Sequence, residues 1–275
     1  MVADPSPNLK VHEKLLLTGA AGGLGRALRE RLKADCSVLR LSDRVDLGVP
    51  AASEEIVLAD LADAAAVHAA VKGVDAIVHL GGISVEGPFG PILQANILGL
   101  YNLYEAARIH GVRRIVFASS NHVTGFYRQC ETITADAPPR PDGLYGLSKA
   151  FGEDLSRFYF DRYGIETACV RIGSSFPEPR DRRMLATWLS YDDLHRLISA
   201  CLTTPVLGHS IVFGMSDDAV TWWDNSRARH IGYVPRDSSD VFRDAVYART
   251  PAPDLADPAV QFQGGGFVKA GPFAG

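Results

Sequence analysis

A glycine-rich turn close to the start of the chain restricts the fold more than any other feature. The sequence TGAAGGLGR at residues 18–26 stands between an apolar run at 14–18, predicted to be a buried strand, and a predicted helix at 24–33. Glycine allows positive φ and close backbone approach, and the helix behind the turn offers unpaired N–H groups to a pyrophosphate. A lone glycine-rich turn is a weak signal, but the strand and helix that a dinucleotide motif requires are both present. We therefore expect a dinucleotide site lined by Gly19, Gly22, Gly23, Leu24 and Gly25.

Strand and helix patterns then alternate along the chain. Further apolar runs predict strands at 36–42, 56–58, 76–80, 114–119 and 167–172. Helical patterns lie between them at 64–71, 92–110 and 144–163. This alternation predicts an α/β fold with a doubly wound parallel sheet of the Rossmann type.

The character of the sequence changes after Gly173. Prolines, a cluster of arginines at 180–183 and the pair Trp222–Trp223 suggest a smaller region outside the sheet. The segments 194–202 and 211–213 can still supply a helix and a strand there. We expect two parts in one domain: a dinucleotide-binding Rossmann part over 12–175, and a smaller substrate-binding C-terminal region over 176–275 packed against it.

Composition and charge exclude several classes of protein. The 275 residues suffice for one large domain, and a net charge of −4 with mixed signs gives no nucleic-acid footprint. No apolar run approaches the ~20 residues of a membrane span, and the first ten residues lack the features of a secretory signal. We expect no metal, nucleic-acid or membrane partner. A reduced, cytoplasmic protein is favoured by four well-separated cysteines, Cys36, Cys130, Cys169 and Cys201.

A tyrosine and a lysine at helical spacing carry the strongest catalytic signal. Tyr145 and Lys149 are four residues apart in the predicted helix at 144–163, so both side chains lie on one face. A nearby ammonium favours the phenolate, which lets a tyrosine with an ordinary pKa near ~10 act as a general base closer to neutrality. The spacing also arises by chance on many helices. Here a Ser-Ser-Asn run at 119–121 and the glycine turn precede it, which favours a catalytic pair.

The ends of the following strands extend the expected dinucleotide site. Asp43 closes the second predicted strand, 24 residues after Gly19, where a carboxylate can bind both ribose hydroxyls and repel a 2′-phosphate. NAD is therefore favoured over NADP, although Arg44 could bind a 2′-phosphate and so leaves some use of NADP open. The alternative role of Asp43 is that of an ordinary cap at the end of the strand. For Asn96, which lies in the middle of a predicted helix, the alternative is an amide that faces solvent or packs between helices. Further cofactor contacts are expected from Asp60, Leu61, Leu80, Gly81, Gly82 and Asn96.

These motifs together resemble the extended branch of the short-chain dehydrogenase/reductase superfamily over residues 14–175. The resemblance implies that Tyr145 is the acid/base, and that Lys149 lowers the pKa of Tyr145 and binds the nicotinamide ribose. It also implies that Ser120 hydrogen-bonds the reacting oxygen, with Ser119 as the competitor for that role. Ser120 is preferred because it lies five residues before Gly125, the serine-to-glycine spacing of the extended branch.

Additional motifs along nearly the whole chain are similar to those of the uronate dehydrogenase family. They are GGISVE at 81–86, SSNH at 119–122, RIGS at 171–174, PEP at 177–179, RML at 183–185, WWDN at 222–225 and GGFV at 265–268. The resemblance implies an NAD-dependent oxidoreductase of carbohydrate metabolism, active in hexuronic acid catabolism. Such an enzyme oxidises C1 of D-galacturonate or D-glucuronate to the aldarolactone. Ile172, within the RIGS motif, is then a further cofactor contact.

A hexuronic acid requires a fixed cation for its carboxylate and several hydrogen-bonding groups. Arg183 can hold a carboxylate through two parallel hydrogen bonds, although Arg180 and Arg182 compete for this role and a surface charge is the alternative. Polar residues that follow the predicted strands reach the edge where open α/β sheets bind ligands. Phe267 either packs on the sugar or anchors the core. The expected substrate contacts are Ser84, Ser120, Asn121, His122, Ser174, Arg183 and Phe267.

Two other functions stay open at this point. One is a sugar-nucleotide epimerase or dehydratase of the same extended branch, but only about 100 residues follow Gly173, which is short for a nucleotide-binding half. The other is a non-catalytic NAD-binding regulator, a class that tends to lose the tyrosine or the lysine. The sequence leaves the oligomeric state open, a homo-oligomer included, together with the preferred uronate epimer and the lactone that forms first.

Overall fold

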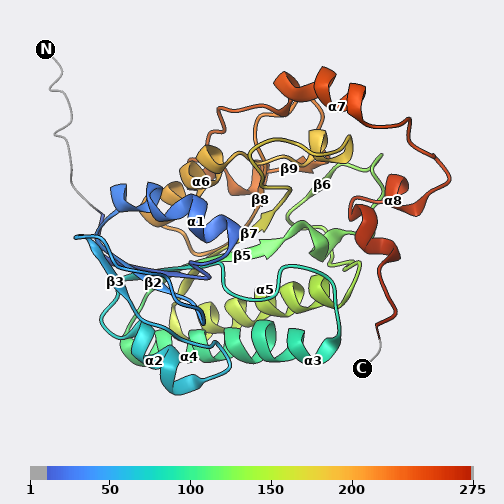
Figure 1. The fold of residues 1–275 in the computed structure, drawn as a ribbon. Helices are drawn as coiled ribbons and strands as arrows, with labels where there is room; N and C mark the ends of the chain where they lie inside the picture. The colour runs from blue at the N-terminus through green and yellow to red at the C-terminus, as the bar shows by residue number, and fades with distance from the viewer. Residues whose placement is uncertain (1–10, 274–275) are drawn as a thin grey trace, which may run out of the picture.

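A seven-stranded parallel sheet forms the centre of the molecule (Figure 1). The computed structural model describes residues 11–273, so the N-terminal segment expected to lack a secretory signal lies outside the described residues. The strand order is β3-β2-β1-β4-β5-β7-β8, and every pairing is parallel. The predicted fold class is therefore confirmed. The strands are β1 His12–Thr18, β2 Cys36–Ser42, β3 Glu54–Ile56, β4 Ala76–His79, β5 Arg114–Ser120, β7 Glu166–Ile172 and β8 His209–Gly214.

Helices cover both faces of this sheet (Figure 1). Leu15 and Leu17 of β1 point to one face, where they join a core cluster with residues of α1 and α6. Leu16 points to the other face and packs with residues of α2, α4 and α5. This alternation is the period-2 pattern of a strand that is buried on both sides. The helices are α1 Gly23–Arg29, α2 Ala64–Val71, α3 Phe89–Ile92, α4 Gly99–His110, α5 Leu144–Tyr163, α6 Tyr191–Thr203, α7 Arg243–Arg249 and α8 Pro258–Gln261.

Most predicted elements form, and the departures have local causes. The helix predicted at 92–110 begins earlier, at Phe89, because Pro91 fits a first helical turn, and residues 93–98 form a π-helical segment before α4. The helix predicted at 24–33 is divided into α1 and a 3₁₀ segment at 31–34. The third strand is paired over Glu54–Ile56, two residues before the predicted run at 56–58.

The second half of the chain contributes to the sheet itself. β8 pairs with β7 from Thr167↔His209 to Ile172↔Gly214, so the strand predicted at 211–213 is an edge strand of the main sheet. The division of the chain at residue 175 stays a prediction; the sheet runs on past it. Beyond β8, a two-stranded sheet joins β6 (Ile133–Thr134) to β9 (Trp223–Asp224). The ring of Trp223 in β9 stacks on the ring of Phe213 in β8, 5.0 Å between centroids.

Within residues 11–273, no helix combines the length and apolar character needed to cross a bilayer. The same residues contain no cluster of three or more histidine, cysteine or acidic side chains arranged to hold a metal ion.

Candidate active site

The glycine turn is packed tightly on one side and open on the other. Gly19 has φ +69°, and a Cβ there would lie 2.7 Å from the Gly81 nitrogen, so this position requires glycine. A side chain at Gly25 would clash with the Gly19 carbonyl, which lets α1 begin close to the strands. By contrast, a Cβ at Gly23 would meet nothing within 4 Å. The open side of the turn, at the N-terminus of α1, is thus shaped to receive a phosphate group.

Asp43 stands beside this turn at the end of β2. Its Oδ2 accepts a hydrogen bond from the Ala21 nitrogen at 3.0 Å, and its Oδ1 accepts one from the Arg44 nitrogen at 2.8 Å. These bonds hold the carboxylate at the edge of the glycine turn, where a ribose would lie in a dinucleotide fold. The Arg44 side chain is exposed next to it.

We predict that Asp43→Ala weakens NAD binding and relaxes discrimination against NADP. The charge that repels a 2′-phosphate is removed, while Arg44 stays available to attract it. The ratio of kcat/KM for the two cofactors measures this effect. Asp46→Ala is the matched control, because Asp46 is exposed and accepts a hydrogen bond from the nearby Gly48 nitrogen, away from the glycine turn. An unchanged cofactor ratio in Asp43→Ala would show that Asp43 does not read the ribose.

The other predicted cofactor residues fall into two groups. Leu80, Gly81 and Gly82 directly follow β4, as expected, beside the glycine turn. Asp60 and Leu61 lie in a turn beyond β3 instead of at its end, because β3 stops at Ile56.

Asn96 occupies the π-helical segment and is buried. Its Oδ1 accepts from the Ile83 nitrogen at 2.7 Å, and its Nδ2 donates to the Ile83 carbonyl and to Ser148 Oγ, both at 2.9 Å. The amide therefore ties the loop after β4 to helix α5, and any effect of Asn96 on a cofactor acts through the shape of that loop.

Tyr145 and Lys149 lie buried on the first turns of α5, at the carboxyl edge of the sheet. Burial raises the pKa of Tyr145 to about 12, although a hydrogen bond with Ser120 acts in the opposite direction. Lys149 Nζ donates to the Ala118 carbonyl at 2.8 Å and lies 5.8 Å from the centre of the Tyr145 ring. Burial also lowers the pKa of Lys149 to about 8. This differs from the expectation that the lysine brings the phenolate closer to neutrality, because burial dominates both pKa values.

The two candidate serines have different surroundings. Ser119 donates to Glu153 Oε1 at 2.6 Å, and this carboxylate also pairs with the buried Arg171 at 2.8 Å. Ser119 therefore belongs to a buried structural network. Ser120 faces Tyr145 and accepts a hydrogen bond from the His122 nitrogen at 3.2 Å. Of the two hydroxyls, the one beside Tyr145 is that of Ser120.

Arg183 is held by three neighbours. Its Nε donates to the Gln263 carbonyl at 2.7 Å, its Nη2 to Asn121 Oδ1 at 2.8 Å and its Nη1 to Ser174 Oγ at 3.4 Å. Asn121 also donates to the Ile172 carbonyl at 3.1 Å. Burial lowers the pKa of Arg183, yet a guanidinium stays charged at neutral pH. Since a guanidinium has five N–H groups, hydrogen atoms on Nη1 and Nη2 stay available for an anion.

Aromatic rings form one wall of the same site. The Phe267 ring stacks on the His122 ring, 3.8 Å between centroids and 14° between planes. Tyr145 meets both rings edge-on, at 5.7 Å from His122 and 6.2 Å from Phe267. A segment near the C-terminus is thereby placed directly beside the acid/base candidate.

Ser84 and Glu86 lie on the loop after β4. Ser84 is exposed, and no hydrogen bond of its side chain is found among residues 11–273. Glu86 instead caps the helix that carries Tyr145: Oε1 accepts from the Leu144 nitrogen at 2.8 Å, and Oε2 accepts from the Tyr145 nitrogen at 2.9 Å. A carboxylate at this position satisfies two N–H groups that have no partner within the helix.

We predict that Glu86→Ala lowers the free energy of unfolding by about 1–2 kcal/mol, the cost of losing a helix cap, and lowers kcat because α5 loses its anchor beside Tyr145. Glu86→Gln keeps one acceptor oxygen, so its free energy of unfolding and its kcat should lie between those of the unmodified protein and those of Glu86→Ala. Denaturant unfolding and steady-state kinetics measure the two effects. Glu178→Ala, at an exposed position, serves as the control. Unchanged stability in Glu86→Ala would exclude the capping role.

Three residues at the site escaped the sequence analysis: Glu86, Asp142 and Gln263. Glu86 was visible within the GGISVE motif, but nothing in its spacing connects it to α5. Asp142 precedes the predicted helix by two residues, a position that usually signals only a cap. Gln263 is fully buried, and its carbonyl supports Arg183, from which it is separated by 80 residues in the sequence.

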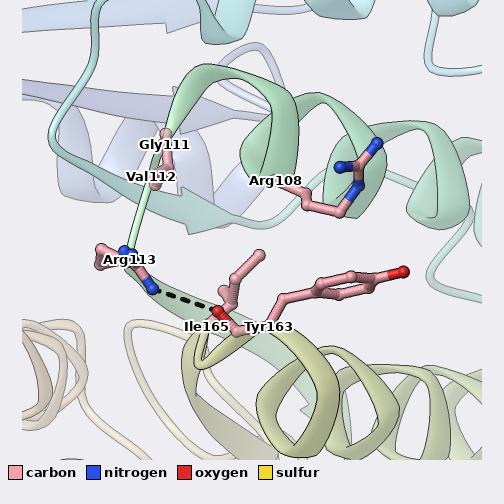
Figure 2. A pocket seen from close by; sticks show the side chains of 6 residues that line it. All are labelled: Arg108, Gly111, Val112, Arg113, Tyr163 and Ile165. Carbon is pink, nitrogen blue, oxygen red and sulfur yellow. Dashed lines mark hydrogen bonds between the residues drawn. The ribbon is translucent and has the colours of Figure 1, made fainter.

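A separate shallow cavity of about 170 Å³ lies at the opposite edge of the sheet. Figure 2 shows it between the end of α4 and the end of α5, near the first residues of β5 and β7. The side chain of Arg113, one of the lining residues, donates to the Tyr163 carbonyl at 3.1 Å. The cavity is lined by Arg108, Gly111, Val112, Arg113, Tyr163 and Ile165, and it has no part in the site described above.

Comparison with known proteins places this site in a family. The sequence profile of the NAD dependent epimerase/dehydratase family matches residues 15–194. The chain is 62% identical over 262 residues to the uronate dehydrogenase of Pseudomonas putida, covering 94% of this chain and 97% of that protein. It is 57% identical to the uronate dehydrogenase of Agrobacterium fabrum, covering 93% and 97% of the two chains.

A solved structure shares the whole fold. It is a tyrosine-to-alanine variant of uronate dehydrogenase from Agrobacterium tumefaciens complexed with NAD. Its TM-score with this chain is 0.92 at 56% sequence identity, covering 94% of this chain and 98% of that one. The similarity therefore includes most of the chain that follows residue 175 as well.

Proposed function

The chain belongs to the NAD dependent epimerase/dehydratase family and, within it, to the uronate dehydrogenases, and from this premise we propose that its site oxidises a hexuronic acid at C1 to the aldarolactone. NAD is the cofactor, and the chain is an NAD-dependent oxidoreductase. The substrate is a small-molecule uronate.

The observation that carries the proposal for C1 is the placement of one fixed cation beside one acid/base pair. Arg183 is bonded to Asn121, which directly follows Ser120 in the chain, and Ser120 faces Tyr145. A hexuronic acid has a carboxylate at one end and the C1 hydroxyl at the other side of its ring. Holding the carboxylate on Arg183 therefore limits which carbon faces Tyr145, and such positioning removes a large part of a reaction barrier.

The open glycine turn and the carboxylate of Asp43 fit the dinucleotide. A phosphate can approach the open side of the turn, and Asp43 can accept hydrogen bonds from ribose hydroxyls. When bound, NAD supplies the acceptor for the hydride that leaves C1.

Each residue of the catalytic group has a distinct task in this proposal. In its phenolate form, Tyr145 accepts the proton of the C1 hydroxyl and becomes the neutral phenol, while Ser120 holds the same oxygen through a hydrogen bond. Lys149, with a pKa of about 8, can exchange a proton near neutral pH, and in this proposal it binds a hydroxyl of the nicotinamide ribose. Because the sugar ring stays closed, the product is a lactone.

The two alternatives that the sequence left open are less well supported. An epimerase or dehydratase acting on a sugar nucleotide needs space for the nucleotide, whereas here Phe267 and Gln263 bring the C-terminal segment onto His122 and Arg183. A non-catalytic regulator has no need for a buried Tyr145 and Lys149 beside a serine hydroxyl. Relatives of 57–62% identity over nearly the whole chain are uronate dehydrogenases.

Incubating the purified protein with NAD and either D-galacturonate or D-glucuronate tests the proposal. We expect NADH absorbance to appear, and the product to be the aldarolactone by NMR. UDP-glucose is the control substrate, since its conversion would support the epimerase alternative. Absence of NADH with both uronates would overturn the proposal.

We also propose the cytoplasm as the location of the protein. Cys169 and Cys201 are buried free thiols and Cys130 is an exposed one, which suits a reducing compartment.

A further inference from the structure

Asp142 is a buried carboxylate at the centre of the site that the mechanism above does not use. Its side chain is fully buried, and its Oδ2 lies 2.6 Å from His122 Nδ1. Its Oδ1 is also buried and has no hydrogen-bond partner among the described residues. The backbone of Asp142 donates to the His122 carbonyl at 3.3 Å, so the two residues are joined twice. Burying a carboxylate is costly unless it is paired and fully hydrogen-bonded, and within residues 11–273 Oδ1 of Asp142 is not.

Glycines from three segments make room for this carboxylate. A side chain at Gly125 or Gly264 would clash with Asp142 Oδ2, and a Cβ at Gly146 would lie 3.1 Å from its Oδ1. These glycines come from the loop after β5, from α5 and from the C-terminal segment. The space therefore fits one small acidic side chain, fixed against one nitrogen of His122.

A carboxylate can only accept a hydrogen bond, which decides the tautomer of His122. Nδ1 must carry the hydrogen that points to Asp142, and in the neutral ring Nε2 then has a lone pair. Burial lowers the pKa of His122, and Arg183 acts in the same direction, while Asp142 and Glu86 oppose this shift. The ring is held flat against Phe267, so its orientation is fixed as well.

We propose, on the basis of the function proposed above, that Asp142 is a positioning residue that makes His122 Nε2 an obligatory hydrogen-bond acceptor for a sugar hydroxyl. A hydroxyl can donate to this nitrogen, whereas a carboxylate cannot. The carboxylate of the substrate therefore cannot bind at His122 and binds at Arg183 instead. The pocket thus distinguishes the carboxylate of the sugar from its neutral hydroxyls through two groups. His122 Nε2 can only accept a hydrogen bond, and the guanidinium of Arg183 can only donate one.

The tautomer can be observed directly in the whole enzyme. Long-range ¹H–¹⁵N correlation spectra of uniformly ¹⁵N-labelled protein at neutral pH report the protonation of each histidine nitrogen, and His122→Gln assigns the His122 signals. We expect a neutral ring with hydrogen on Nδ1. Hydrogen on Nε2, or on both nitrogens, would overturn the inference. This result does not depend on catalytic activity, so it is independent of the proposed function.

Kinetics with deoxy sugars test the consequence. Galacturonate and its 2-, 3- and 4-deoxy analogues are compared for the unmodified enzyme and Asp142→Ala. We expect one analogue to lose at least ~10-fold in kcat/KM with the unmodified enzyme, the value of a buried hydrogen bond. Asp142→Ala should lose a similar factor on galacturonate but none further on that analogue, with the KM for NAD unchanged.

Asp181→Asn is the matched control, because Asp181 also acts on Arg183 by its charge but does not contact His122. It should keep the analogue discrimination of the unmodified enzyme. If Asp142→Ala slows all four sugars by one factor, or if no analogue is impaired with the unmodified enzyme, the positioning role is wrong. Complete inactivity of the unmodified enzyme on both galacturonate and glucuronate would instead refute the proposed function and leave the tautomer measurement valid.

Discussion

Tyr145→Phe is expected to reduce kcat by a factor of ~10² or more, the usual contribution of general acid–base catalysis, while NAD binding stays nearly intact. The phenol oxygen is the only change, and Ser120 keeps its place beside the ring. Steady-state kinetics and a direct measurement of NAD affinity separate the two effects. Tyr101→Phe is the matched control, because Tyr101 is exposed on α4, outside the site.

The same residue should govern the pH dependence. Burial raises the pKa of Tyr145 to about 12, so the protonated phenol prevails at neutral pH and proton acceptance becomes easier as the pH rises. We expect kcat of the unmodified enzyme to increase from neutral to alkaline pH, and the residual activity of Tyr145→Phe to lose this dependence. Near-normal turnover in the variant would remove Tyr145 from the catalytic role.

Arg183→Ala is expected to nearly abolish uronate oxidation with NAD affinity retained. Charge-assisted hydrogen bonds contribute ~1.5–3 kcal/mol, so their loss costs at least ~10-fold in kcat/KM. The cost is larger if the sugar then lies out of register with the cofactor. Arg183→Lys should recover little, since an ammonium cannot make the paired contact. Galactose, which lacks the carboxylate, should be a poor substrate of the unmodified enzyme.

The neighbouring arginine provides the control for this experiment. Arg182 bonds Thr250 and stacks over Tyr247, away from Ser120 and Tyr145, so Arg182→Ala should retain uronate oxidation. Kinetics on galacturonate and galactose are measured for every variant. Equal oxidation of the two sugars by the unmodified enzyme, or a loss on both alike in Arg183→Ala, would contradict the carboxylate-binding role.

The sequence predicts best those features that local rules determine. The ends of α5 and of β2 could be predicted because helical and strand periodicity are strong there. The sequence also predicts that Tyr145 and Lys149 share a helix face. The pKa of Tyr145 was not predictable, because it depends on how deeply α5 is buried and not on the spacing of two residues.

Long-range contacts account for what the sequence could not provide. Asp142 reaches its role through glycines that lie up to 122 residues away in the chain, at Gly264. Glu86 caps a helix that starts 58 residues later. β8 was expected outside the sheet because prolines and arginines after Gly173 obscure the strand–helix alternation, yet its pairing with β7 completes the sheet. Each of these relations is decided by packing, which a single sequence does not display.

Gln263 connects the C-terminal segment to Arg183. Its carbonyl accepts from Arg183 Nε at 2.7 Å, while its side-chain amide donates to the Arg128 and Glu131 carbonyls and accepts from Trp223 Nε1 at 3.0 Å. During synthesis on a ribosome, the glycine turn and Tyr145 therefore exist well before the support of Arg183 does. A newly made chain can therefore complete the contacts that hold Arg183 only after residues 263–267 have emerged and docked.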